Sequence, residues 1–184
     1  MSEPKEKLLT AAIDYVAANG MSDLSLRRLA TAIGTSHRML IYHFGSKEGL
    51  LVELIRAVEQ RQRDALTQLE LEPGATLADL SRAFWRRLTD PALWPHERLF
   101  FEIYGQALQG RPGTTALLDG IVSDWVEPLT ELGVRHGFAE DAARASARLG
   151  LAVSRGLLLD LLATGDRAGV DAAMARFVEL MYES

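Results

Sequence analysis

The sequence predicts an all-α protein of about nine helices, with a three-helix domain near the N-terminus and a larger helical body after it. Three observations lead to this prediction. Apolar residues recur at helical spacing along most of the chain, no segment alternates as a half-buried strand would, and residues that cap or end helices punctuate the pattern. We expect residues 1–47 to form the first domain and residues 48–184 the second, with the boundary inside one continuous helix.

The first predicted helix spans residues 5–18. Leu9, Ile13 and Val16 share one face of it, and Gly20 follows at a position where helices commonly end. We expect this helix to support the two short helices that come next.

The second predicted helix spans residues 26–33 and has two clear ends. Ser25 precedes it and can cap the free N–H groups of the first turn, while Gly34 suits the left-handed conformation that often follows a helix. One apolar face is formed by Leu26, Leu29, Ala30 and Ile33. We expect this face to pack against the rest of the domain.

A third short helix is predicted from His37 to Phe44, with Ser36 as its N-cap. Leu40 and Phe44 are four residues apart and would both point inward, which leaves the residues between them partly outward. Two short helices joined by a turn that contains glycine are typical of a helix-turn-helix, whose second helix enters the major groove of DNA.

A long helix is predicted from Ser46 to about Leu71. Ser46 is the expected cap, and Lys47 lies in the first turn, where free N–H groups and positive charge suit a phosphate oxygen. Neither Pro nor Gly occurs between Leu50 and Glu72. This helix should therefore act as a rigid lever between the two domains.

The remaining chain predicts five more helices. We expect Pro128 to kink or interrupt the third of them, because proline lacks an N–H group and clashes with the preceding turn. Gly165 and Asp166 should end one helix and cap the next. The predicted ranges are about 76–89, 96–108, 114–136 (from Thr114 or Thr115), 138–163 and 166–182.

Three groups of residues near the N-terminus resemble the TetR family of bacterial repressors. They are Gly34-Thr35-Ser36, Leu40-Ile41-Tyr42-His43-Phe44, and Ser46-Lys47-Glu48 with Leu50. The resemblance covers about the first fifty residues and departs from the family pattern twice: Thr35 replaces a usual Val, and Ile41 replaces a usual Tyr. It implies a homodimeric transcriptional regulator, a repressor released from a palindromic DNA operator by a small apolar or amphipathic effector.

We expect His37 and Arg38 to read bases, because an arginine fork fits guanine O6 and N7. Ile41 could touch a thymine methyl group. The remaining DNA-binding candidates, expected to hold phosphates, are Arg27, Thr35, Ser36, Tyr42 and Lys47. The alternative is that these basic residues are ordinary surface charge.

The charge distribution favours DNA binding by the N-terminal end. The net charge is −5, yet residues 1–50 hold six basic and five acidic side chains, against fourteen basic and twenty acidic ones in residues 51–184.

The body holds candidates for an effector site and a dimer interface. Aromatic residues gather in its centre, as in many apolar ligand pockets, although most aromatic residues at helical spacing belong to the core. The effector-site candidates are Phe84, Trp85, Phe100, Phe101, Tyr104, Trp125 and Arg155. The last two helices are apolar on more than one side, and the resemblance implies that they dimerise as a four-helix bundle; simple burial is the alternative. The interface candidates are Gly156, Leu159, Met174, Phe177, Val178 and Met181.

Several other classes of protein find little support in the sequence. It has no Cys, no apolar run long enough to span a membrane, no secretory signal and no catalytic or metal-binding motif. We therefore expect a cytoplasmic protein with no cofactor, no metal and no enzyme activity. Two alternatives stay open: a helical small-molecule-binding protein or enzyme with an incidental N-terminal motif, and an adaptor whose apolar last helices bind another protein.

Overall fold

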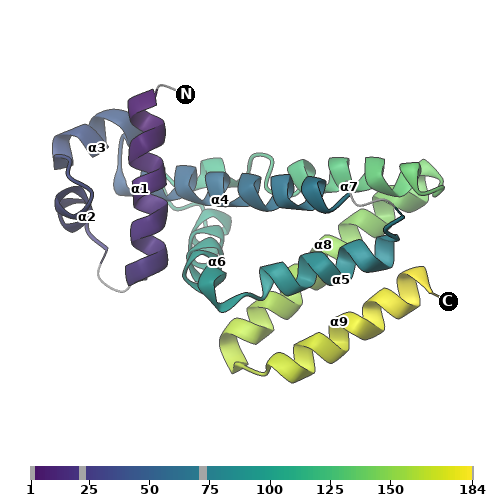
Figure 1. Cartoon of the computed structure of the whole chain (residues 1–184). Coiled ribbons are helices and arrows are strands. Elements are labelled where there is room, and N and C mark those ends of the chain that lie inside the picture. The colour runs from purple at the N-terminus through teal and green to yellow at the C-terminus, as the bar shows by residue number, and fades with distance from the viewer. Residues whose placement is uncertain (1–2, 21–23, 71–73, 184) are drawn as a thin grey trace. The chain divides into compact units, whose positions relative to one another are not determined.

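Helices account for nearly all the regular structure of the chain. The computed structural model describes residues 3–20, 24–70 and 74–183, and these contain nine α-helices, two short 3-10 helices and no strand (Figure 1). The all-α prediction is therefore confirmed. The elements are α1 (Glu3–Asn19), α2 (Leu26–Ala32), α3 (His37–Phe44), α4 (Lys47–Glu70), α5 (Leu77–Leu88), η1 (Pro91–Leu93), α6 (Trp94–Leu108), η2 (Thr115–Leu118), α7 (Ser123–Arg135), α8 (Glu140–Thr164) and α9 (Arg167–Tyr182).

The chain divides into two compact units that are not continuous in sequence. The first unit comprises residues 1–62 and 91–119, and the second comprises residues 63–90 and 120–184. The first unit thus contains α6 and η2 in addition to the N-terminal helices. The boundary predicted at residue 47 stays a prediction.

The core of the first unit forms where the N-terminal helices meet α4 and α6. Its side chains are aliphatic and almost wholly buried, and α1 packs against both α2 and α6. Burial of such side chains is worth about 1.5–3 kcal/mol each, so this core holds the short helices α2 and α3 in place. The most deeply buried members include Val16, Leu29, Leu40, Leu50, Leu54, Leu99 and Ile103.

The second unit is built from helix pairs. Helix α8 packs against α7 and against α9, and Figure 1 shows α8 and α9 running side by side. The turn between them contains Gly165. Gly165 has φ +73°, and the carboxylate of Asp166 accepts a hydrogen bond from Gly169 N at 2.9 Å. The predicted stop and cap at this turn are both confirmed.

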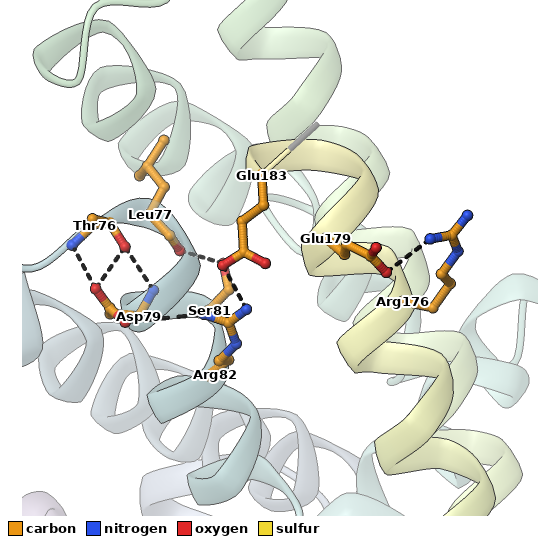
Figure 2. A network of polar contacts seen from close by, with 8 residues as sticks. All are labelled: Thr76, Leu77, Asp79, Ser81, Arg82, Arg176, Glu179 and Glu183. Carbon is orange, nitrogen blue, oxygen red and sulfur yellow. Dashed lines mark hydrogen bonds and ion pairs between the residues drawn. The ribbon is translucent and has the colours of Figure 1, made fainter.

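Polar contacts join α5 to α9 within the second unit. Arg82 of α5 donates to Glu183, just after α9, at 2.7 Å (Figure 2). At the start of α5, Thr76 and Asp79 form a capping box in which each side chain accepts a hydrogen bond from the other residue's backbone N–H. The sequence predicted that a helix starts near residue 76, and the capping box is the local reason why it starts there.

The predicted helix from Thr114 or Thr115 through Val126 is wrong. Residues 115–118 form the 3-10 helix η2, and α7 begins only at Ser123. Gly120 separates them with φ +83°, a conformation that favours glycine, and a Cβ there would lie 2.6 Å from Asp124 Oδ1. Pro128 neither ends nor divides α7, because its missing N–H leaves only the carbonyl of the exposed residue Asp124 without its usual partner.

Candidate DNA-binding site

Helix α2 forms because both its cap and its buried face are satisfied. The Ser25 hydroxyl accepts a hydrogen bond from Arg28 N at 3.2 Å, as an N-cap should. Leu26 and Leu29 are buried, whereas the side chain of Arg27 is exposed. The helix therefore presents a basic residue on the side opposite its packing surface.

The turn between α2 and α3 is closed by backbone hydrogen bonds. Gly34 has φ +69°, and Thr35 N donates to Ala30 O at 2.9 Å. The Ser36 hydroxyl then accepts from Met39 N at 3.2 Å and caps α3. The accepting oxygen still carries an O–H group, so Ser36 can cap the helix and donate to a phosphate together.

Helix α3 has a buried side and an exposed side, as the sequence predicted. Leu40 and Phe44 are 0% and 8% exposed, and they fix the helix to the core. On the other side, His37 and Arg38 are exposed and Tyr42 is 77% exposed. An α-helix with its side chains is about 10–12 Å across, so α3 can enter the major groove, which is about 12 Å wide.

The junction between α3 and α4 is tight. Ser46 caps α4 by accepting a hydrogen bond from Gly49 N at 2.9 Å. A Cβ at Gly49 would lie only 2.3 Å from the carbonyl oxygen of Phe44, so glycine is needed where the two helices approach closely. Lys47, the first residue of α4, is half-buried beside this junction.

Lys5 has a role that the sequence did not reveal. Its ammonium group lies 3.2 Å from Glu53 of α4 and 5.4 Å from the centre of the Phe44 ring. It thus connects α1 to both α3 and α4 through an ion pair and a cation–π contact. Neither contact has a local signal in the sequence, because both partners come from distant positions.

The DNA-binding candidates all lie on neighbouring elements of the first unit, at exposed or half-buried positions. They occupy α2, the turn after it, α3 and the first turn of α4, in the order Arg27, Thr35, Ser36, His37, Arg38, Ile41, Tyr42 and Lys47. Their roles stay predictions, and the geometry gives one polar, partly basic surface to test.

The effector-site candidates fall into two groups, one in each unit. In the first unit, the Phe100 ring lies 5.2 Å from that of Phe101 and 5.4 Å from that of Tyr104. In the second unit, the rings of Phe84 and Trp125 lie 5.6 Å apart. The role of each group as an effector site stays a prediction.

Two further effector-site candidates are held by polar partners in the second unit. Trp85 donates its indole N–H to Asp171 at 2.7 Å, and Arg155 donates to Ile121 O at 2.8 Å. The second unit also has a surface hollow of about 550 Å³ between α7 and α8, which none of the seven candidates lines. Its lining consists of Glu127, Thr130, Glu131, Val134, Arg135, Glu140 and Arg144.

The dimer-interface candidates differ in exposure. Leu159 is 51% exposed and Gly156 is exposed, whereas Met174 and Val178 are 4% and 0% exposed. Met174 and Val178 therefore pack inside the single chain. Phe177 is half-buried, and its ring would lie 3.9 Å from a Cβ placed at Gly150 of α8; Met181 is half-buried as well.

Residues 8–54 match the family model for bacterial regulatory proteins of the tetR family. The matched segment runs from α1 into α4 and includes the whole helix-turn-helix. The N-terminal region of this chain thus matches the TetR family. The resemblance predicted from Gly34 to Leu50 is thereby confirmed.

Solved structures extend the TetR likeness to the whole chain. A TetR-family regulator from Rhodococcus sp. is 18% identical, with a TM-score of 0.75, 99% of this chain covered and 100% of that chain. A TetR regulator from Legionella pneumophila is 19% identical, with a TM-score of 0.72 and coverages of 99% and 98%. A transcriptional regulator from Saccharomonospora viridis, solved with choline, is 22% identical, with a TM-score of 0.66 and coverages of 97% and 95%.

At these identities the likeness shows a common fold. The chain therefore has the fold of TetR-family transcriptional regulators, with the N-terminal helix-turn-helix followed by a helical C-terminal part. Among curated proteins, none matches the sequence of this chain. Within residues 3–20, 24–70 and 74–183, no helix combines the length and the apolarity that crossing a membrane requires.

Proposed function

We propose that this protein is a transcriptional repressor that binds a palindromic DNA operator as a homodimer and is released by a small-molecule effector. The observation that carries the proposal is the exposed side of α3. Three side chains there, His37, Arg38 and Tyr42, face solvent on a helix held by the buried Leu40 and Phe44.

Side chains in the first half of α3 are the ones expected to contact the base edges. Arg38 can donate two parallel hydrogen bonds to guanine O6 and N7, and His37 can donate to or accept from a base edge. Ile41 is 36% exposed and can contact a thymine methyl group, which is the apolar feature of the major groove. Sequence preference should therefore depend most on Arg38.

Residues on and around α3 are expected to bind the DNA phosphates. Arg27 and Lys47 carry charge, while Thr35, Ser36 and Tyr42 carry hydroxyl groups that can donate to phosphate oxygens. These contacts fix the position of α3 in the groove without reading sequence. They should make binding weaken as salt rises, because cations near phosphates release counterions.

Dimerisation is assigned to the exposed side of α8 and α9. Leu149 and Leu159 on α8 and Leu180 on α9 are 46%, 51% and 55% exposed. Gly156 lies between the two leucines of α8 and allows another helix to approach closely. Two copies of the α8–α9 pair would form a four-helix bundle, with Phe177 and Met181 at its edge.

The effector is assigned to the aromatic groups of the helical body. The pairs Phe84–Trp125 and Phe100–Tyr104 offer the apolar lining that small organic ligands need. The Saccharomonospora viridis regulator, solved with choline, shows that a protein of this fold holds a small organic molecule. Effector and operator would oppose each other to the same extent, because coupling free energy is reciprocal.

The proposal is tested by selecting bound fragments from random DNA with the full-length protein. We expect enrichment of a palindrome whose half-sites lie about 34–36 Å apart or a multiple of that distance. Adding candidate effectors to the same selection should reduce the yield without changing the enriched sequence. Recovery of no common sequence would contradict the proposal, and it would favour the alternative of a helical small-molecule-binding protein or enzyme.

A further inference from the structure

His96 is a buried polar residue on α6 for which the DNA-binding surface has no use. Its side chain is 7% exposed, and its Nε2 lies 3.1 Å from the carbonyl oxygen of Ile13 on α1. Because a carbonyl can only accept, Nε2 must carry the proton and donate. The other ring nitrogen, Nδ1, is buried and has no hydrogen-bond partner among the described residues. Among the described residues, the imidazole is therefore held by the single hydrogen bond from Nε2 to Ile13.

The helix that His96 holds is central to the first unit. Ile13 is 3% exposed and lies in the middle of α1, which packs against α2. The same helix is joined to α3 and α4 through Lys5, which lies near Phe44 and Glu53. A change in the position of α1 would therefore be passed to every helix that carries a DNA-binding candidate.

The segment after α6 makes a second attachment, at the start of α4. Arg111 lies 3.7 Å from Glu48, and a Cβ at Gly113 would lie 3.0 Å from the Cβ of Glu48. About two turns further along α4, Arg56 donates to the carbonyl oxygen of Ala116 in η2. Residues at both ends of the 96–116 segment thus bind the N-terminal helices.

We call α1, α2, α3 and the start of α4 the DNA-reading head, because these helices hold or support the DNA-binding candidates. We propose that α6 and η2 are a structural part of this head, and that His96 is the positioning residue that fixes α1 to α6. This inference rests on the proposed DNA-binding function. Its consequence is that the orientation of α3, and hence the half-site spacing that a homodimer accepts, depends on a hydrogen bond remote from DNA. The head would then extend well beyond the segment of residues 8–54 that the family model matches.

The first experiment compares His96→Gln with His96→Asn in the full-length protein. Both variants carry the same amide, but only glutamine reaches the position of Nε2. Amide hydrogen exchange should be about fivefold faster across α1 in His96→Asn, because one hydrogen bond is lost, and close to wild type in His96→Gln. The matched control is His136→Asn in the second unit, where the ring also faces backbone carbonyls, of Leu132 at 3.0 Å and Ala75 at 3.4 Å. Wild-type exchange of α1 in His96→Asn would overturn the proposal.

The second experiment measures affinity for palindromes whose centre spacing differs by one base pair from the best site. Spacing preference is the ratio of the affinity for the best spacing to the affinity for the altered spacing. This ratio should be the same in wild type and His96→Gln, and about fivefold smaller in His96→Asn. An unchanged preference in His96→Asn would overturn the positioning role. If the wild type binds no palindrome, the proposed function fails, and the exchange experiment still decides whether His96 holds α1.

If His96→Asn does not fold, the solvent-exposed attachment provides the test. Arg111→Ala removes an ion pair with Glu48 in which the arginine side chain is 55% exposed, so folding should survive. We expect the spacing preference to fall about twofold, in keeping with the small strength of an exposed pair. A preference equal to wild type would show that residues 96–116 do not position the head.

Discussion

Helix α3 and the α8–α9 pair both leave large apolar side chains exposed, but the residues around those side chains differ. On α3, Ile41 and Tyr42 are accompanied by His37 and Arg38, which can form hydrogen bonds with bases. On α8, the small residues Gly156 and Ala152, both exposed, lie between Leu149 and Leu159. Exposure alone therefore indicates a missing partner, and the neighbouring residues indicate its chemistry: a polyanion for α3 and a second apolar helix for α8.

The largest expected effect comes from comparing a buried residue of α9 with an exposed residue of α8. This comparison separates side chains that pack inside one chain from side chains that pack between two copies. Met174→Ala removes a buried side chain and should lower the free energy of unfolding by about 2–5 kcal/mol. Leu159→Ala, at an exposed position, should change the stability of the monomer by less than about 0.5 kcal/mol and yet weaken the dimer. Chemical denaturation and sedimentation equilibrium measure the two quantities. Equal dimerisation in wild type and Leu159→Ala would remove Leu159 from the interface.

Arg38→Ala should have the next largest effect, on DNA binding. It should cost about 1–3 kcal/mol at the selected operator and much less on random DNA, because a base-reading fork is lost. Fluorescence anisotropy with the two DNAs measures the difference. Arg61→Ala, at an exposed position of α4, is the control. A loss of the same size on both DNAs would show that Arg38 does not read bases.

Lys47→Ala should have a smaller effect, which is independent of sequence. Binding should weaken by the same factor on the operator and on random DNA, and the slope of log affinity against log salt should become shallower by about one per subunit. A salt titration from low to moderate ionic strength gives this slope. If the slope stays at the wild-type value, Lys47 does not contact phosphate.

The smallest effect concerns Asp79, far in sequence from the DNA-binding candidates. Hydrogen bonds from Thr76, first from its hydroxyl at 2.6 Å and then from its backbone N–H, hold the pKa of Asp79 below its usual value of 3.8 (Figure 2). A carboxyl with a lowered pKa stabilises the folded state above its unfolded pKa, and that contribution is lost as pH falls through the folded pKa.

Asp79→Asn should therefore lower the thermal midpoint slightly at pH 6, and by progressively less as the pH falls below 3.8 and through the folded pKa. Asp14→Asn, at an exposed position in the interior of α1 and away from both of its ends, serves as the control. A pH-independent difference between wild type and Asp79→Asn would show that the cap does not depend on the charge of the carboxylate.

Local features of the fold could be predicted from the sequence because each depends on residues close together in the chain. The caps at Ser25, Ser36 and Ser46 need only a hydroxyl within three residues of a free N–H. The inward direction of Leu40 and Phe44 follows from helical spacing. The family pattern is likewise confined to one continuous segment, which is why its recognition from the sequence was correct.

Features that depend on long-range contacts could not be predicted. Lys5 meets Glu53 across forty-eight positions, and His96 meets Ile13 across eighty-three, so neither pairing has a local signal. The predicted start of α7 is wrong because apolar residues continue at helical spacing across Gly120, where the backbone turns with φ +83°. Met174 and Phe177 share one apolar stripe in sequence, and only the packing of α8 against α9 separates the buried residue from the half-buried one.

The central claim is that two copies of this chain read one palindrome through α3. The most direct measurement is the mass of the complex, by native mass spectrometry, on a full palindrome and on the same DNA with one half-site scrambled. We predict two chains on the palindrome and binding to the scrambled site that is weakened at least about tenfold, because base contacts are lost on one side. One chain per palindrome, or equal affinity for the two DNAs, would contradict the account.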